Sequence, residues 1–337
     1  MRSRENPFVV HVSHDTSLTI TTSSSHSLRA KILHSVLRLF YPPIISRFVQ
    51  NPTESSHQHV KVPKSLRKRF MVTKRDFYDW TVYDISSKPR KDQEEKAGVT
   101  KRCMMYIPGT GFTIPTSSEH FRFIAKAFAS DYPSVVTVVL HPLAPKHTVS
   151  EVYPKFFELY SQLLAEMSLE RGPEGGELDI GGDSSGGGIC LSIVQHLEAR
   201  GLRLPNRLFL MAPSVDFVQP NAEDMKKVSK LDPLQRVDRN YAAHVRWVNG
   251  EMELDDPIVS PIRGDFRCLK GVKVVGMAGT YDILEPDCVR LRERMRDEGI
   301  QVEWMVGEKT VHCWPLMQAY LLPEGRRAVG WIILKMK

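Results

Sequence analysis

Short apolar runs alternate with longer amphipathic segments over most of the chain. The runs that predict strands are 75–86, 101–108, 134–140, 177–182, 206–212, 272–279 and 300–306. The segments with helical spacing are 117–129, 150–170, 188–199, 285–298 and 314–335. Because apolar strands that alternate with amphipathic helices are typical of a parallel sheet covered on both faces, we expect an α/β fold with a mostly parallel central sheet.

The N-terminal part has a weaker pattern. Residues 1–27 are rich in Ser, Thr and His and predict a loose leader. Residues 28–49 predict a helix, which Pro42 and Pro43 should end or bend. Its apolar stripe consists of Leu28, Ile32, Val36, Leu39 and Phe40, with Arg29, Lys31 and Arg38 on other faces. Such a stripe is compatible with a membrane surface, but we favour a groove on the protein itself.

The charge balance is mildly basic. The formal net charge is +7, and much of the excess lies in "KVPKSLRKRF", residues 61–70. This segment could be a nuclear-import or nucleic-acid patch, or a solvated approach to an edge strand. Since no aromatic-interleaved basic surface and no zinc spacing accompany it, we favour the edge strand and expect no nucleic-acid partner.

Cysteine spacing and hydropathy bear on the compartment. The five cysteines are odd in number and never spaced as CxxC: Cys103, Cys190, Cys268, Cys288 and Cys313. This argues against a disulfide framework and a structural zinc site, and it favours a reducing compartment. The N-terminus has no apolar core of signal-peptide length, and no run of about 18 apolar residues occurs. We therefore expect a soluble, cytoplasmic protein.

The stretch "LDIGGDSSGGGICLSIVQHL", residues 178–197, places two serines among five glycines between a predicted strand and a predicted helix. Gly182 to Gly186 fits G-x-S-x-G, the nucleophile elbow that exposes a serine hydroxyl above a sheet edge. A P-loop would need Lys and Ser/Thr after its last glycine, and the G-x-G-x-x-G spacing is not met. The motif therefore indicates Ser184 as a nucleophile.

A serine nucleophile needs a histidine base and an acid that orients it. In this kind of fold the chain order is Ser, acid, His, each after a strand. Asp282 follows the strand that ends at Gly279, and His312 follows the strand that ends near Val306. Either residue alone could be an ordinary loop residue. Both together, in this order, predict a Ser184–Asp282–His312 triad.

With these residues identified, the chain resembles the hormone-sensitive-lipase branch of the α/β-hydrolases. Its elbow reads "GDSSGG" where that family typically has GDSAGG. Four more segments are similar to family motifs: "LAPKH" (143–147), "PSVD" (213–216), "DPIVSP" (256–261) and "YDILEPD" (281–287). The resemblance covers about residues 68–335. It implies an α/β-hydrolase fold with a helical cap: residues 1–60 as leader and cap helix, and 61–337 as the hydrolase domain with a cap insertion at about 213–260.

The loop after the predicted strand 101–108 departs from the family. Where the family usually has HGGGF, this chain has "PGTGF", residues 108–112. By resemblance, the oxyanion hole would be made by the backbone N–H groups of Thr110, Gly111 and Ser185. Thr110 is the weak member, because a β-branched residue restricts the backbone. Pro108 replaces a histidine that usually organises this loop.

The resemblance implies a carboxylesterase for a small or medium hydrophobic ester, with no cofactor and no metal. Two alternatives stay open: a pathway-specific hydrolase or acyl-processing enzyme of secondary metabolism, and a non-catalytic small-molecule receptor on the same fold. Membrane association is compatible with the sequence but not favoured, and a homodimer is left open. The cap aromatics are candidates for either the pocket or the cap's own core: Phe40, Tyr41, Phe48, Phe217, Tyr241 and Trp247.

Overall fold

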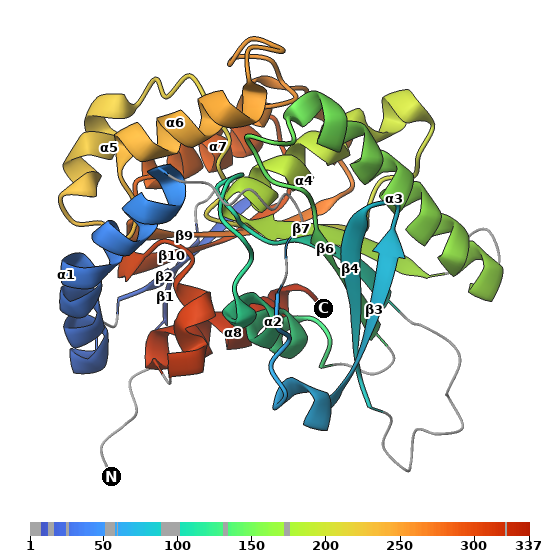
Figure 1. Ribbon diagram of the computed structural model, residues 1–337, viewed down its shortest axis with the longest axis horizontal. Helices are drawn as coiled ribbons and strands as arrows, with labels where there is room; N and C mark the ends of the chain where they lie inside the picture. The colour runs from blue at the N-terminus through green and yellow to red at the C-terminus, as the bar shows by residue number, and fades with distance from the viewer. Residues whose placement is uncertain are drawn as a thin grey trace.

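A computed structural model describes residues 8–12, 17–24, 27–50, 58, 60–88, 102–130, 134–171, 176–320 and 322–337. One sheet of ten strands runs through the molecule in the order β1-β2-β10-β9-β8-β7-β5-β6-β4-β3 (Figure 1). The strands are β1 Phe8–Val12, β2 Leu18–Ser23, β3 Phe70–Phe77, β4 Trp80–Ser87, β5 Arg102–Ile107, β6 Ser134–Leu140, β7 Glu177–Asp183, β8 Arg207–Met211, β9 Lys273–Tyr281 and β10 Val302–Val311.

The strands from β2 to β6 in this order pair in parallel, whereas β1, β3 and β4 pair antiparallel at the two edges. The expectation of a mostly parallel sheet is confirmed. Parallel strands are usually buried on both faces, which explains their continuous apolar runs. All five residues of β8 are buried, for example.

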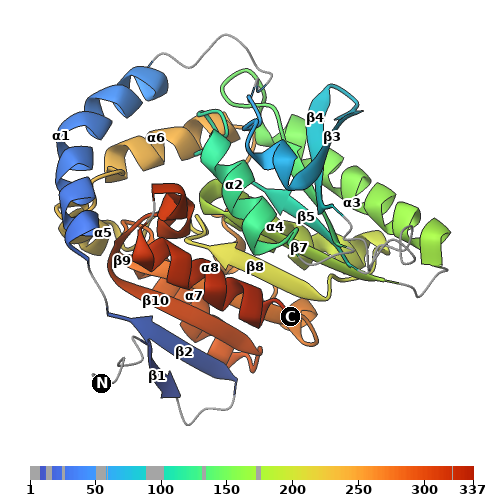
Figure 2. The same cartoon turned by 90° about the horizontal axis from the view of Figure 1, so that it is seen from below.

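Helices cover both faces of the sheet. They are α1 Leu28–Gln50, α2 Ser118–Ala127, α3 Val149–Arg171, α4 Ser184–Leu197, α5 Ala222–Ser229, α6 Val237–Val248, α7 Glu285–Asp297 and α8 Pro323–Lys335. Short 3-10 helices are η1 Leu66–Lys68, η3 Glu198–Arg200, η4 Pro261–Arg263, η5 Arg267–Leu269 and η6 Trp314–Tyr320. Figure 1 shows α3 to α7 on one side of the sheet, and Figure 2 shows α2 and α8 in front of the other.

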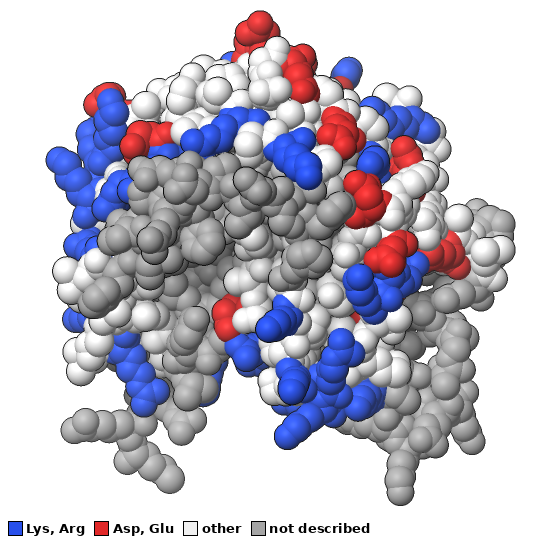
Figure 3. All heavy atoms as spheres, in the orientation of Figure 1, with Lys and Arg blue, Asp and Glu red and all other residues white. Residues whose placement is uncertain are grey.

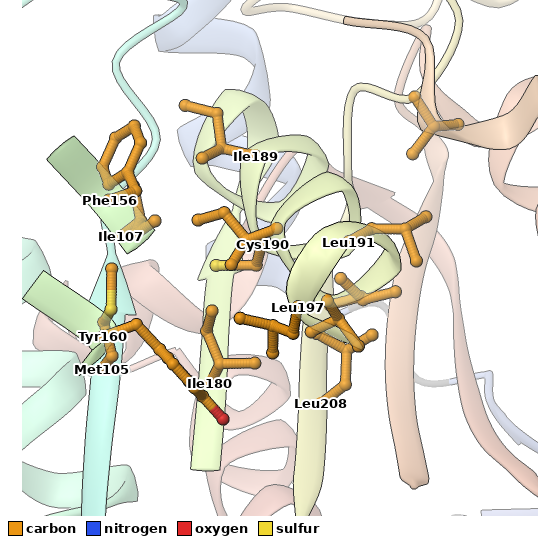
Figure 4. Packing of buried hydrophobic residues seen from close by; sticks show 14 of the residues in the cluster. Met105, Ile107, Phe156, Tyr160, Ile180, Ile189, Cys190, Leu191, Leu197 and Leu208 are labelled. Atoms are coloured by element: carbon orange, nitrogen blue, oxygen red, sulfur yellow. The ribbon is translucent and has the colours of Figure 1, made fainter. Parts of the chain in front are cut away.

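The core between the sheet and α4 holds the central helix in place. Figure 4 shows side chains of β5, β7 and β8 packed against this helix. Ile180 of β7, Leu208 of β8 and Leu191 of α4 are fully buried. Since each buried aliphatic side chain contributes about 1.5–3 kcal/mol, this layer fixes α4 against the strand that precedes it.

One predicted strand is in fact a hairpin. The run 75–86, expected as a single strand, is divided between β3 and β4, which pair antiparallel from Phe77 with Trp80 outward. Tyr78 makes the turn with a φ of 53°. A left-handed turn position is usually marked by Gly or Asn, and the sequence has neither there.

The expected loose leader contains strands. β1 and β2 extend the sheet, with β2 parallel to β10 and Leu18 buried. The prediction for 1–27 is therefore wrong over these strands, because the β-branched run "LTITTS" favours a strand although its Ser and Thr content is typical of a loop.

The stripe on α1 does not cover a groove. Leu28, Ile32, Val36 and Leu39 are 71%, 56%, 45% and 71% exposed. That expectation is wrong, because neighbouring residues of the helix face inward: Ala30 is buried, and Leu33 and Leu37 line a cavity. α1 also continues past Pro42 and Pro43 to Gln50. The side chains of Phe40, Tyr41 and Phe48 lie outside the described part of the structure.

The basic segment 61–70 leads through η1 into β3, which is an edge strand of the sheet. Its lysines and arginines are exposed, and Figure 3 shows basic side chains gathered over this segment at the lower edge of the molecule. This is the solvated approach to an edge strand that we favoured. All five cysteines are buried and unpaired. Among the described helices, none has the length and apolar character needed to cross a bilayer.

Candidate active site

Four loops at the carboxyl ends of β5, β7, β9 and β10 meet at one rim of the sheet. A cavity of about 540 Å³ opens there. Ser184, His312, Thr110 and Gly111 all line it. Asp282 lies behind His312, fully buried, and the Ser185 side chain is also buried. The structure therefore brings together every site residue that the sequence predicted.

Ser184 sits in a strained turn between β7 and α4. Its φ is 54°, a left-handed conformation that is costly for a residue with a side chain. Glycines on either side make the turn possible: a Cβ on Gly182 or on Gly186 would overlap the carbonyl group of Ile107 in β5. This is the geometry of a nucleophile elbow, and it leaves Ser184 partly exposed at the cavity.

His312 is held by Asp282. The distance from His312 Nδ1 to Asp282 Oδ2 is 2.7 Å, and Asp282 Oδ1 accepts the Leu284 N–H at 2.9 Å. Burial alone would lower the pKa of His312, but the charge and hydrogen bond of Asp282 outweigh it, with help from Asp232 and Asp183. The pKa of His312 is therefore raised above its ordinary value.

The predicted contact between Ser184 and His312 is open in the structure. Among the described residues, Ser184 Oγ and His312 share no hydrogen bond, although both face the same cavity. Catalytic hydrogen bonds often tighten only in the complex with substrate, so an open contact does not exclude the pair. The serine–histidine step stays a prediction.

The "PGTGF" loop differs from the expectation in one contact. The Thr110 N–H, expected to face an oxyanion, donates to Ser185 Oγ at 3.0 Å. The Gly111 N–H has no acceptor in the described part of the chain, and Gly111 and Phe112 take φ values of 49° and 62°. The Ser185 N–H lies in the first turn of α4, where backbone N–H groups have no intrahelical partner. Two of the three expected donors are thus free, and the third is occupied.

Sequence reasoning did not identify a buried polar network behind the elbow. Asp183 accepts the Tyr106 hydroxyl at 2.9 Å and contacts His120 Nε2 at 3.2 Å. Its carboxylate also accepts the Gly109 N–H. Burial alone would raise the pKa of Asp183, but His120 and the hydrogen bonds outweigh it and lower the pKa. A charged Asp183 therefore connects the start of the "PGTGF" loop, through the Gly109 N–H, to the turn that carries Ser184.

His120 joins the start of α2 to Asp183. Its Nδ1 accepts the Ser117 N–H at 3.3 Å, which leaves Nε2 to donate to Asp183. Ser117 caps α2, so the helix start holds this ring. No clear signal in the sequence indicated this contact, because a capping box has Glu or Gln three residues after the Ser, whereas this chain has His120 there.

Aromatic packing joins the "PGTGF" loop to the segment 213–260. Phe112 stacks on Trp247 with ring centroids 5.0 Å apart, and it meets Phe217 edge-on at 5.4 Å. Phe217 and Trp247 are each 2% exposed and belong to the main hydrophobic core, whereas Tyr241 is 44% exposed. Neither Phe217 nor Trp247 lines the cavity, and both pack in the main core and not in a separate core of residues 213–260.

The other family-like motifs have structural roles. Asp216 of "PSVD" pairs with Arg263 and Arg290. Ser260 of "DPIVSP" accepts the Phe217 N–H at 2.8 Å and donates to the Leu254 carbonyl. These contacts connect both ends of the segment 213–260 to each other and to α7.

We found no group of three or more His, Cys, Asp or Glu side chains arranged as metal ligands within the described ranges. The chemistry that the site can perform is that of its own groups: a hydroxyl on a strained turn, an imidazole at the cavity bonded to a buried carboxylate, and backbone N–H donors that face the same space.

Comparison with known proteins places the chain in a family. A family model described as an α/β-hydrolase fold matches residues 104–316. An esterase of Acinetobacter venetianus is 26% identical over 227 residues, 67% of this chain and 72% of that protein. Human hormone-sensitive lipase is 25% identical over 146 residues, 43% of this chain and 13% of that protein.

Solved structures have the same architecture. The crystal structure of an esterase from the bacterial hormone-sensitive lipase family superposes with a TM-score of 0.70 at 18% identity, and it covers 93% of this chain and 100% of its own. The chain belongs to the α/β-hydrolase fold family, in its hormone-sensitive-lipase-like branch of esterases and lipases.

Proposed function

We propose that this protein is a serine hydrolase that cleaves a hydrophobic carboxylic ester through an acyl-enzyme on Ser184. The observation that carries the proposal is the shared cavity: a serine with a φ of 54° and a histidine bonded to a buried carboxylate face the same space. Relatives whose names include esterase and acetyl-hydrolase support the reaction class.

In the proposed mechanism His312 takes the proton of Ser184 as its oxygen attacks the ester carbonyl. Asp282 keeps Nδ1 protonated and stabilises the imidazolium that forms. The N–H groups of Gly111 and Ser185 receive the developing oxyanion. His312 then returns the proton to the departing alcohol, and water, activated by the same imidazole, releases the acid.

The cavity supports a hydrophobic substrate of modest size. Its volume of about 540 Å³ lies in the ordinary range for small-ligand pockets. Aliphatic side chains from separate elements form much of its wall: Leu33, Leu37, Ile114, Leu234, Leu316 and Met317. Such a wall favours an acyl or alcohol group without charge.

Labelling with a fluorophosphonate probe, alongside a p-nitrophenyl ester series, tests the proposal. Wild type should be labelled and should hydrolyse esters, and Ser184→Ala should do neither. His312→Ala should fold normally and lose at least 1,000-fold in kcat. A folded wild type that stays unlabelled would favour the receptor reading, and a narrow ester profile would favour a pathway-specific hydrolase.

One observation favours a second candidate, a lipase that works at a lipid surface. The exposed apolar stripe on α1 lies on the helix that also contributes Leu33 and Leu37 to the cavity. The helix has no acidic residue. Flotation with anionic vesicles separates the candidates: wild type should float and an Ile32→Glu/Val36→Glu variant should not, whereas an esterase for dissolved esters would leave both in the soluble fraction.

A further inference from the structure

A second buried carboxylate lies next to the histidine–acid pair. Asp232, in the loop between α5 and α6, is 1% exposed. Its Oδ1 accepts the N–H groups of Leu234 at 2.7 Å and Gln235 at 3.0 Å. Its Oδ2 accepts the N–H of Ile283 at 3.1 Å. All these bonds need an acceptor at this position.

These bonds connect two parts of the site that are far apart in sequence. Leu234 and Gln235 form part of the cavity wall. Ile283 directly follows Asp282, and the next N–H, that of Leu284, binds Asp282 Oδ1. A displacement of Asp232 would therefore move the wall and the acid loop together, and with them the ring of His312.

The charge of Asp232 also acts on Asp282 and His312. Burial and the charge of Asp282 raise the pKa of Asp232 to about 6, while its backbone hydrogen bonds oppose that rise. Asp232 in turn helps to raise the pKa of His312. Other ionisable or charged groups also surround Asp232 and His312. They are Asp183 of β7, Cys313 between β10 and η6, Glu285 and Arg292 of α7, and Arg236 between α5 and α6.

We propose that Asp232 is a positioning residue for the reaction: one carboxylate holds the cavity wall and the Asp282 loop in register and sets the electrostatic environment of His312. The inference rests on the proposed function of the site. Asp232 touches neither the reacting atoms nor the cavity surface, so it acts through Asp282 and His312.

Asp232→Asn removes the charge and leaves a single oxygen acceptor for three N–H groups. We expect kcat on a p-nitrophenyl ester to fall by about 10- to 100-fold, since a small misplacement of a catalytic group has this effect. We also expect the acidic limb of kcat/KM to move to lower pH, because the imidazole loses a negative neighbour. Asp232→Glu keeps the charge but displaces it, so kcat should fall while the limb stays in place.

Asp287→Asn is the matched control. Asp287, on α7, is another buried carboxylate, 2% exposed, and its Oδ1 accepts the side-chain N–H of Asn221 at 2.9 Å. It does not line the cavity. A purely structural effect would lower the melting temperature of both Asp232→Asn and Asp287→Asn. The acidic limb of kcat/KM would then lie at the wild-type pH in both variants. That result would overturn the inference.

NMR titration of the His312 ring separates this inference from the proposed function. The ring should lose its proton at lower pH in Asp232→Asn than in wild type, whether or not an ester is hydrolysed. An identical titration in both proteins would refute the role of Asp232. An inactive, unlabelled wild type with the expected titration difference would refute the hydrolase proposal instead. If Asp232→Asn does not fold, unchanged kcat in Asp232→Glu would refute the positioning role.

Discussion

Ser185→Ala should make the enzyme faster. The Ser185 hydroxyl accepts the Thr110 N–H at 3.0 Å, so one expected oxyanion donor is occupied in the structure. Thr110 lines the cavity, and its N–H would be left without this acceptor in the variant. The released N–H can then meet the oxygen that becomes negative in the transition state.

The size of the gain follows from the value of this bond. A typical hydrogen bond contributes about 1 kcal/mol net, which corresponds to about fivefold in rate if wild type must break it in every turnover. If wild type never breaks it, the variant gains a complete donor, worth about 100- to 1,000-fold. We therefore expect kcat to rise at least about fivefold, with little change in KM.

The same change should cost stability. A buried N–H without a partner lowers the free energy of unfolding by about 1–3 kcal/mol, measured by urea denaturation. Ser192→Ala is the matched control, since Ser192 is a fully buried serine of the same helix that donates to the Ile258 carbonyl at 2.8 Å. It should lose stability but keep its kcat. A folded Ser185→Ala protein with unchanged or lower kcat would refute the reasoning.

Three further predictions concern the same site. The raised pKa of His312 means that the imidazole is neutral only above its ordinary value of 6.5, so the acidic limb of kcat/KM should lie above pH 6.5; a limb at or below that pH would contradict this. Thr110→Gly should raise kcat on generic esters by less than Ser185→Ala, because Thr110 Oγ1 also accepts the Phe112 N–H at 3.1 Å; a loss would mean that the loop is tuned by its threonine. His120→Ala should lower kcat about 10-fold by loosening the Asp183 anchor, while His120→Gln should restore part of it; equal kcat in His120→Ala and wild type would remove His120 from the loop's support.

Local patterns identified much of the sheet and the residues that the loops carry to its rim. β5 to β10 follow from apolar, β-branched runs, because burial on both faces leaves a continuous signal. The elbow was readable because a strained turn demands small residues around Ser184, and this demand is local in sequence. The turn at Tyr78 was missed because no Gly or Asn marks it, and the strand β2 was missed because its Ser and Thr content outweighed its β-branched pattern in our prediction.

The sequence by itself identified the candidate nucleophile, the order of the triad candidates and the loop that departs from the family. Only the tertiary structure decided which hydroxyl occupies the Thr110 N–H, which histidine supports Asp183, and which acid lies beside Asp282. Ser185, His120 and Asp232 come from three separate elements, and no spacing along the chain records that they meet their partners. The physical reason is that hydrogen bonds between distant segments depend on how the sheet and the surrounding helices and loops pack. A turn or a strand, in contrast, depends mainly on residues that are neighbours in the sequence.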